Sequence, residues 1–308
     1  MTRPGRTRAL AASLRLPNLP SVWSNTLTGV IFACLIQDHG NLALAPLALL
    51  TASCLYFAGN LFNDWADQAW DKEHRPERAL PSGVFNPSQY LALGMLLCLI
   101  GLAAAAITSF TAMSVSAALT LFIVTYTWCH KRTALGVIPM ALCRASLPLL
   151  GFSACAGSWH QAQWIVLPAG MLFCYLIMLS LRARAESKPN TSPLMTWLTG
   201  FGFLLPVAIL ATTPDSPITH MDGIKALFAA TIPYGVWIAL TLTIFRKPIP
   251  RQISALLAGI PLIDALFLTP YVLLGHADTN HPVAFWLLLA WAPAFITGRL
   301  LQRYVPAT

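Results

Sequence analysis

One polar stretch decides the interpretation of this chain: Asn60-Leu-Phe-Asn-Asp-Trp-Ala-Asp-Gln-Ala-Trp-Asp-Lys-Glu-His-Arg-Pro-Glu-Arg-Ala-Leu-Pro-Ser-Gly83. It follows an apolar run, 42–62, that is long enough for a helix. At about 100° per helical residue, five of its polar side chains fall on one face about 100° wide. These five are Asn60, Asn63, Asp64, Asp67 and Asp71.

This acidic face is unfavourable without a partner. Its carboxylates repel one another at spacings of three and four residues, and they lie at the negative end of the helix dipole, each effect costing a few tenths to about 1 kcal/mol. A divalent cation removes both costs, and Mg²⁺ takes one or two carboxylates while keeping places for water and phosphate oxygens. Arg75 and Arg78 follow directly, and guanidinium groups bind phosphate in a bidentate way. The stretch therefore predicts a site for Mg²⁺ and diphosphate, with a solvated polar helix end as the alternative.

Composition places the chain in a lipid bilayer. Of its 308 residues, 56% are hydrophobic and only 10% are charged, and the mean hydropathy is +0.65. Soluble domains carry about 25% charged residues. A net charge of +8 would suggest nucleic acid in a soluble protein, but the position of the charge along this chain indicates a membrane surface, so we expect no nucleic-acid partner.

Apolar runs of about 20 residues predict membrane-spanning helices. Such runs lie near 18–37, 41–63, 88–108, 110–129, 133–154, 163–182, 194–213, 223–245, 252–275 and 282–300. They predict an all-α, polytopic membrane bundle that forms one domain over residues 1–308.

The basic residues orient these spans. If segment 1–17 is cytoplasmic, even-numbered spans end inside, and the inner segments hold every one of the 19 Lys and Arg residues except Lys225 and Arg144. Such a bias toward one side fixes membrane orientation. We therefore expect a multi-pass protein of the inner, cytoplasmic membrane, with its N-terminus and its polar stretch on the cytoplasmic side.

The run 63–83 is similar to the first signature of the UbiA superfamily, the intramembrane prenyltransferases related to 4-hydroxybenzoate polyprenyltransferase. That signature reads N-D-x-x-D-x-x-x-D, followed by R-P-x-R and P-S-G. The matched positions are Asn63, Asp64, Asp67, Asp71, Arg75, Pro76, Arg78, Pro81, Ser82 and Gly83. Weaker similarity covers 14–18, which resembles the entry into the family's first helix. It also covers 126–132, followed by Arg144 and Gly151, which resembles the segment spanning the family's fourth and fifth helices.

The resemblance implies a helical bundle, usually of nine spans, around a central cavity that opens toward lipid, whereas the apolar runs predict ten; we therefore expect nine to ten transmembrane helices. It also implies that an isoprenyl diphosphate is ionised there and that an acceptor carbon, often aromatic, captures the allylic cation. The metal ligands it implies are Asn63, Asp67 and Asp71, with Asp64 as a supporting acid. The diphosphate contacts it implies are Arg75, Arg78 and Lys131, although His130 holds the place, four residues after Tyr126, where the family has its lysine.

The second half departs from the family pattern. UbiA proteins usually carry a second Asp-rich motif after the sixth helix, whereas this chain has Glu186 as the only acid of segment 180–189. The basic residues around it are Arg182, Arg184 and Lys188. These cations are candidates to neutralise diphosphate charge in place of a second metal, and ordinary positive-inside anchors are the alternative.

Two charged residues fall near the middle of predicted spans, Arg144 in the fifth and Asp264 in the ninth. A charge at the bilayer centre costs about 2.5–3.5 kcal/mol on insertion scales, which makes each a functional hypothesis. We expect Arg144 to reach the diphosphate or the acceptor from the cavity wall and Asp264 to be structural. A buried pair of the two is the alternative.

The leading hypothesis is Mg²⁺-dependent transfer of an isoprenyl group from a prenyl diphosphate to a lipophilic acceptor within the membrane. The catalytic candidates are Asp64, Asp67, Asp71 and Arg144. An isoprenoid or lipid transporter is one alternative, but it leaves the R-P-x-R and P-S-G match unexplained. The second alternative is a relative that binds prenyl diphosphate without catalysis. The depleted second motif supports this alternative.

Overall fold

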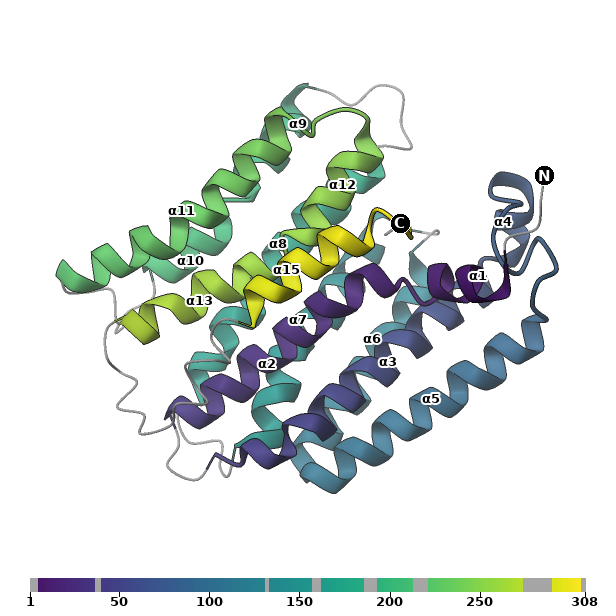
Figure 1. Cartoon of the computed structure of the whole chain (residues 1–308), viewed down its shortest axis with the longest axis horizontal. Helices are drawn as coiled ribbons and strands as arrows, with labels where there is room; N and C mark the ends of the chain where they lie inside the picture. Colours follow the sequence, from purple (N-terminus) through teal and green to yellow (C-terminus); the bar gives the residue numbers. More distant parts are fainter. Residues whose placement is uncertain are drawn as a thin grey trace.

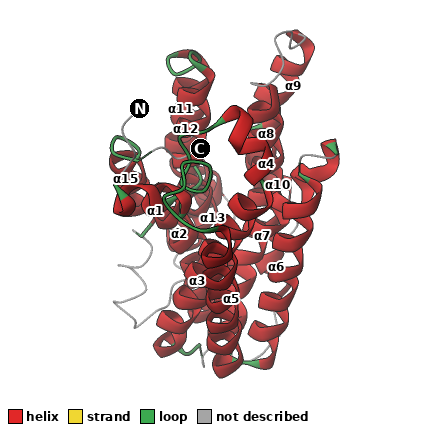
Figure 2. Ribbon diagram, turned by 90° about the vertical axis from the view of Figure 1, so that its right-hand side faces the viewer, coloured by secondary structure: helices red, strands yellow, loops and turns green. Residues whose placement is uncertain are grey.

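The computed structural model describes residues 5–36, 40–130, 133–156, 162–185, 193–212, 221–273 and 290–305. This part of the chain is helical and contains no strand (Figure 2). The all-α prediction is therefore confirmed.

The first half consists of long helices that lie side by side along the molecule and of two short helices at one end of it (Figure 1). In chain order they are α1 (Arg6–Ser13), the 3₁₀ turn η1 (Leu16–Asn18), α2 (Leu19–Ile36), α3 (Ala45–Ala66), α4 (Gln68–His74), α5 (Pro87–Thr108), α6 (Phe110–Cys129) and α7 (Val137–Cys155). The second half comprises α8 (Val166–Ala185), α9 (Pro193–Gly202), α10 (Leu205–Thr212), α11 (Met221–Thr243), α12 (Ile249–Ala258), α13 (Pro261–Leu273) and α15 (Trp291–Leu301).

Seven helical stretches of the described chain are long and apolar enough to cross a membrane. The predicted number of nine to ten spans is not confirmed. The helices α2 and α15 and the pair α9–α10 lie at the three other predicted positions but are outside that set of seven. One reason is visible in the pair α9–α10, where the apolar run is broken between Gly202 and Leu205 into two short helices.

Local sequence signals explain several helix ends. Asn86 and Gln89 form a capping box at the start of α5, so two backbone N–H groups find side-chain acceptors. Ser109, in extended conformation, separates α5 from α6 and accepts a hydrogen bond from the backbone N–H of Ala112. The Asn86 cap thus marks the start of α5, and the Ser109 cap marks the α5–α6 break at the position predicted from hydropathy.

The centre of the bundle is a close crossing of α2 and α7. A Cβ atom added to Gly29 would lie 1.9 Å from the carbonyl oxygen of Pro148, and one added to Gly151 would lie 1.9 Å from that of Thr26. Only glycine allows two backbones to approach this closely. The helix α7 also packs on α6 and α8, so it joins the two halves and carries Arg144 into the interior.

Burial separates inner from outer helices. The span 249–270, made of α12 and α13, is 89% buried, whereas the span formed by α5 is 22% buried. The exposed residues of α5 include Leu96 and Leu99, as expected for a helix that faces lipid.

Candidate active site

The acidic face lies at the junction of α3 and α4. The helix α3 ends at Ala66, and Asp67 leaves helical geometry with φ −88° and ψ 1° before α4 begins at Gln68. Hydrogen bonds from the N–H of Asp67 to Asn63 and from the N–H of Asp71 to Asp67, 3.0 and 2.9 Å, cross this junction. The predicted helical stripe is thus interrupted at Asp67, yet its two parts keep their polar side chains together.

All five polar residues of the stripe are buried, with between 2% and 8% of their surface exposed. Two of their buried oxygen atoms, Asn63 Oδ1 and Asp71 Oδ1, have no hydrogen-bond partner in the described structure. A buried acceptor without a partner costs about 1–3 kcal/mol, and more when it is charged. Oxygens placed in this way fit a cation that completes the site.

Arg78 pairs with this acidic cluster. Its Nη1 lies 2.9 Å from Asp71 Oδ2 and 3.5 Å from Asp64 Oδ1. The segment 75–86, which carries Arg78 back toward α4, turns at Gly83 with φ +71°. That left-handed conformation favours glycine, which explains the glycine of the P-S-G match.

Arg15 is a site residue that sequence reasoning missed. It adopts a left-handed conformation, φ 49° and ψ 48°, and its Nη1 donates to Asn60 Oδ1 at 2.9 Å. The Tyr56 hydroxyl donates to the Arg15 carbonyl at 2.9 Å, and Arg15 Nη2 lies 3.8 Å from Asp64 Oδ1. The similarity of segment 14–18 to the family marked this region, but no spacing rule links Arg15 to Asn60 across 45 positions.

The electrostatic surroundings keep Arg15 positively charged. Burial works to lower the pKa of its guanidinium, but the Asp64 carboxylate and nearby phenolic and acidic groups outweigh burial, so the pKa is raised above its ordinary value. The acidic cluster therefore holds a permanent positive charge at the start of the first long helix.

A hollow of about 340 Å³, here called the outer hollow, lies beside this cluster. The basic side chains among the residues that line it are Arg15, Arg75, Arg78, His130 and Arg184. Two of them, Arg15 and Arg78, form ion pairs with carboxylates of the α3–α4 junction. A hollow lined by guanidinium groups next to unpartnered oxygens suits a diphosphate held with a metal ion.

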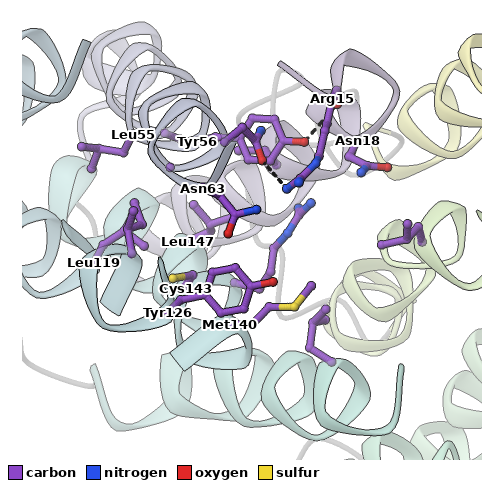
Figure 3. A pocket seen from close by; sticks show the side chains of 18 residues that line it. Arg15, Asn18, Leu55, Tyr56, Asn63, Leu119, Tyr126, Met140, Cys143 and Leu147 are labelled. Atoms are coloured by element: carbon purple, nitrogen blue, oxygen red, sulfur yellow. Dashed lines mark hydrogen bonds between the residues drawn. The ribbon is translucent and has the colours of Figure 1, made fainter. Parts of the chain in front are cut away.

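A second cavity of about 140 Å³, here called the inner cavity, continues from the outer hollow into the bundle, and Arg15, Asn18, Tyr126, Met140 and Leu257 line both. In Figure 3, Leu55 and Leu119 lie at one side and Arg15 and Asn18 at the other, with Asn63 and Tyr126 between them. The walls therefore change from apolar to polar toward the outer hollow. This gradient fits a molecule with a hydrocarbon tail and a charged head group.

Arg144 lines the inner cavity, as the sequence predicts. Its Nη1 donates to Ser21 Oγ at 3.0 Å and to Asn25 Oδ1 at 3.4 Å. Asn25 in turn donates to both carboxylate oxygens of Asp264, 3.1 and 2.9 Å away. Asn25 thus links the two midspan charges, so Arg144 faces the cavity while Asp264 anchors the network from α13.

The remaining predicted phosphate contacts divide into three groups. Arg184 lines the outer hollow, where its Nη2 donates to the carbonyl of His130 at 2.8 Å. Arg182, two residues earlier, turns instead toward Gln252 and Thr199, at 3.0 and 3.2 Å. Lys131 lies outside the described residues, as do Glu186 and Lys188 of the segment that stands in place of the family's second motif.

His130 stands in the outer hollow at the place where the resemblance expects a lysine. Its Nε2 lies 3.3 Å from Asp67 Oδ2, and its ring packs against Tyr126 with centroids 4.9 Å apart. Asp67, at the α3–α4 junction, is therefore in contact with the imidazole of His130 at the end of α6.

The donor set is one that Mg²⁺ accepts. Within the described residues, no group of three or more His, Cys, Asp or Glu side chains lies close enough to hold a metal ion. The stripe instead supplies two carboxylates and an amide, Asp67, Asp71 and Asn63. Mg²⁺ is bound in this way in phosphate sites, where one or two carboxylates hold it and substrate phosphates fill other positions.

Comparisons with known proteins agree with this geometry. A digeranylgeranylglyceryl phosphate synthase of Methanoregula boonei is 33% identical over 149 residues, covering 48% of this chain and about half, 51%, of that relative. Among solved structures, a digeranylgeranylglyceryl phosphate synthase superposes with a TM-score of 0.59 at 17% identity, covering 87% of this chain and 98% of that one. A UbiA homologue from Archaeoglobus fulgidus bound to DMAPP and Mg²⁺ superposes with a TM-score of 0.51 at 16% identity, covering 95% and 98%.

At such identities the solved structures establish the shared fold alone. The UbiA prenyltransferase family itself matches residues 22–269, which include most of the helices and all of the acidic stripe. The chain therefore belongs to the UbiA prenyltransferase family, and is a helical membrane protein.

Proposed function

We propose that the protein transfers an isoprenyl group from an isoprenyl diphosphate to a lipophilic acceptor within the membrane, with Mg²⁺ as cofactor. The observation that carries this proposal is the pair of buried, unpartnered oxygens, Asn63 Oδ1 and Asp71 Oδ1, beside a hollow lined by arginines. The Archaeoglobus homologue bound to DMAPP and Mg²⁺ supports the choice of ligands.

Asn63, Asp67 and Asp71 would hold the metal, which when bound neutralises charge that develops on the leaving diphosphate. Arg78 and Arg15 are already fixed by the acidic cluster, so they meet the diphosphate without reorganisation. Arg184 and Arg75 approach it from the other walls of the outer hollow. We assign Asp64 the role of holding Arg15 and Arg78 in place.

The reaction breaks the bond between the isoprenyl C1 and the diphosphate oxygen, and the electron pair leaves with the diphosphate. The acceptor then forms a bond to C1 and loses a proton. The inner cavity, walled by Leu55, Leu119 and Leu147, excludes water that would capture the allylic cation. Arg144, at the same wall, is placed to orient the acceptor or the diphosphate.

The proposal is tested by incubating membranes that contain the protein with labelled isoprenyl diphosphates of several lengths, and by identifying labelled lipids by mass. We expect a labelled lipid product that requires Mg²⁺ and is lost in Asp67→Ala. Membranes with the exposed variant Glu73→Ala provide the matched control. Movement of labelled lipid without release of diphosphate would instead indicate a transporter, and binding of the diphosphate without any product would indicate a non-catalytic relative.

A further inference from the structure

A separate hollow of about 400 Å³, here called the C-terminal hollow, lies between the start of α12 and the end of α15. Among the residues that the structure describes, its lining includes three arginines and no carboxylate. The residues are Arg251, Ser254, Phe295, Ile296, Arg299, Leu300, Gln302 and Arg303. None of these residues lines the outer hollow or the inner cavity.

Two of the arginines are held on the same aromatic ring. The Cζ atoms of Arg251 and Arg299 lie 4.9 and 5.4 Å from the ring centroid of Phe245. Arg299 also lies 5.4 Å from the ring of Trp237. Cation–π contacts order the two guanidinium groups, but they also bring like charges together, and the ion pairs found in the described chain involve neither of them. An anion between them would remove this repulsion.

The walls of the hollow are fixed by hydrogen bonds between helices. Arg299 Nη1 donates to Gln302 Oε1 at 3.0 Å, and Gln302 Nε2 donates to the carbonyl of Ser254 at 3.0 Å. These bonds tie α15 to α12. Arg299 is thus oriented before any ligand arrives, which reduces the entropy lost on binding.

The start of α12 and the end of α15, which carry this hollow, lie toward the same end of the bundle as α1 and α4 (Figure 1). The helix α15 packs on η1, and a Cβ atom added to Gly298 would lie 3.4 Å from the carbonyl of Pro17. Beside the arginines, Ile296 and Leu300 are exposed by 55% and 45%. The hollow therefore combines a cationic wall, at the end of the bundle that the basic residues predict to face the cytoplasm, with exposed apolar side chains.

We propose that the C-terminal hollow binds the phosphate head group of an anionic membrane phospholipid, with the acyl chains along Ile296 and Leu300. Basic pockets between helices at the cytoplasmic surface suit such head groups, and arginine matches phosphate geometry. A general positive-inside signal requires only charge on that side. It does not require two arginines stacked on one ring around a hollow.

The test is retention of lipid by the full chain in detergent, measured by native mass spectrometry with added phosphatidylglycerol or phosphatidylcholine. We expect the chain to retain phosphatidylglycerol and not phosphatidylcholine. One guanidinium near an anionic lipid corresponds to about a fivefold change in affinity, so Arg299→Gln and Arg303→Gln should each reduce retention by about that factor. Arg303 is exposed, so its replacement leaves packing intact, and Arg8→Gln, an exposed arginine on α1, is the matched control.

A competition experiment with inorganic phosphate distinguishes the source of the phosphate group. Retention of phosphatidylglycerol that survives millimolar phosphate supports a lipid site. Displacement by phosphate, together with binding of phosphate alone, would overturn the lipid assignment. Equal retention of both lipids, or equal retention in Arg299→Gln, Arg303→Gln and Arg8→Gln, would overturn it as well.

Discussion

The α3–α4 junction and the end of α8 both border the outer hollow, but they differ in how their polar groups are hydrogen-bonded. At the α3–α4 junction, Asn63 and Asp71 each keep a buried oxygen without a partner. At the end of α8, Arg182 is bonded to Gln252 and Thr199, and Arg184 to the carbonyls of His130 and Thr133. The first region carries buried oxygens without a partner in the described structure, and the second carries polar groups that bond to neighbouring segments.

This difference indicates which of the two regions requires a ligand. Buried acceptors without partners lower stability, so a fold retains them where binding or catalysis compensates. The α8 end has no such deficit among its described residues, and of its two arginines Arg184 lines the hollow and Arg182 does not. We infer that the α3–α4 junction determines metal binding, while the α8 end contributes one positive charge.

The largest effect is expected at Asp71, which supplies an unpartnered oxygen and also pairs with Arg78. Asp71→Ala should reduce the rate of transfer about 100- to 1000-fold, because it removes charge stabilisation that acts in the transition state. The measurement is the rate of diphosphate release in membranes. Glu73→Ala, exposed on the same helix, should retain activity, and equal losses in both variants would contradict the assignment.

The next largest effect is expected at Arg15. Its guanidinium lines both the inner cavity and the outer hollow, and a hydrogen bond to a charged group is worth about 1.5–3 kcal/mol, so Arg15→Ala should raise KM for the diphosphate about 10- to 100-fold. Arg6→Ala, exposed on α1, serves as the control. An unchanged KM in Arg15→Ala would show that this arginine only holds Asn60 in place.

A pair of variants on α8 separates binding from stability. Arg184→Ala should raise KM for the diphosphate about tenfold and should also lower the free energy of unfolding, because the carbonyls of His130 and Thr133 lose a donor. Arg182→Ala should leave KM unchanged and lower the free energy of unfolding by about 1–3 kcal/mol, because Gln252 and Thr199 lose a partner. Thermal unfolding in detergent and donor titrations check both. The reverse pattern would place Arg182 at the substrate.

The smallest effect is expected from two tyrosine hydroxyls that each donate to a backbone carbonyl. Tyr56 donates to Arg15, and Tyr175 donates to Leu256 in the second half, at 2.9 and 2.7 Å. Tyr56→Phe and Tyr175→Phe should each lower stability by about 0.5–1.5 kcal/mol. Only Tyr56→Phe should also raise KM, about two- to threefold, because Tyr56 fixes the left-handed conformation of Arg15. Equal KM values in both variants would contradict the role of Tyr56 in holding Arg15.

Local patterns in the sequence predicted most of the helices. Hydropathy placed the ends of α5 and α6 within one or two residues of their observed positions, because caps at Asn86 and Ser109 lie at the edges of the apolar runs. The number of spans was less accessible, since composition cannot show that 194–213 breaks into α9 and α10. Helical periodicity brought the acidic residues together correctly but could not reveal the break at Asp67.

Contacts between distant segments were the part that the sequence could not supply. Arg15 reaches Asn60 because the turn at Leu14 and Arg15, between α1 and η1, lies against the last turns of α3, and no spacing rule encodes that approach. Likewise Arg182 and Arg184 read as equivalent cations, yet they lie on different sides of α8 and meet different partners. Arg144 was identified because a charge within an apolar span is unusual at any distance.

The most direct test of the central claim is the binding of geranyl diphosphate to the purified protein, with Mg²⁺ and with a chelator, in the unmodified chain and in Asp71→Asn. This exchange keeps the shape of the side chain and removes its charge. The account predicts tight binding only to the unmodified chain with Mg²⁺, and weak binding that is insensitive to Mg²⁺ in Asp71→Asn. Equal binding with and without Mg²⁺ in the unmodified chain would contradict it.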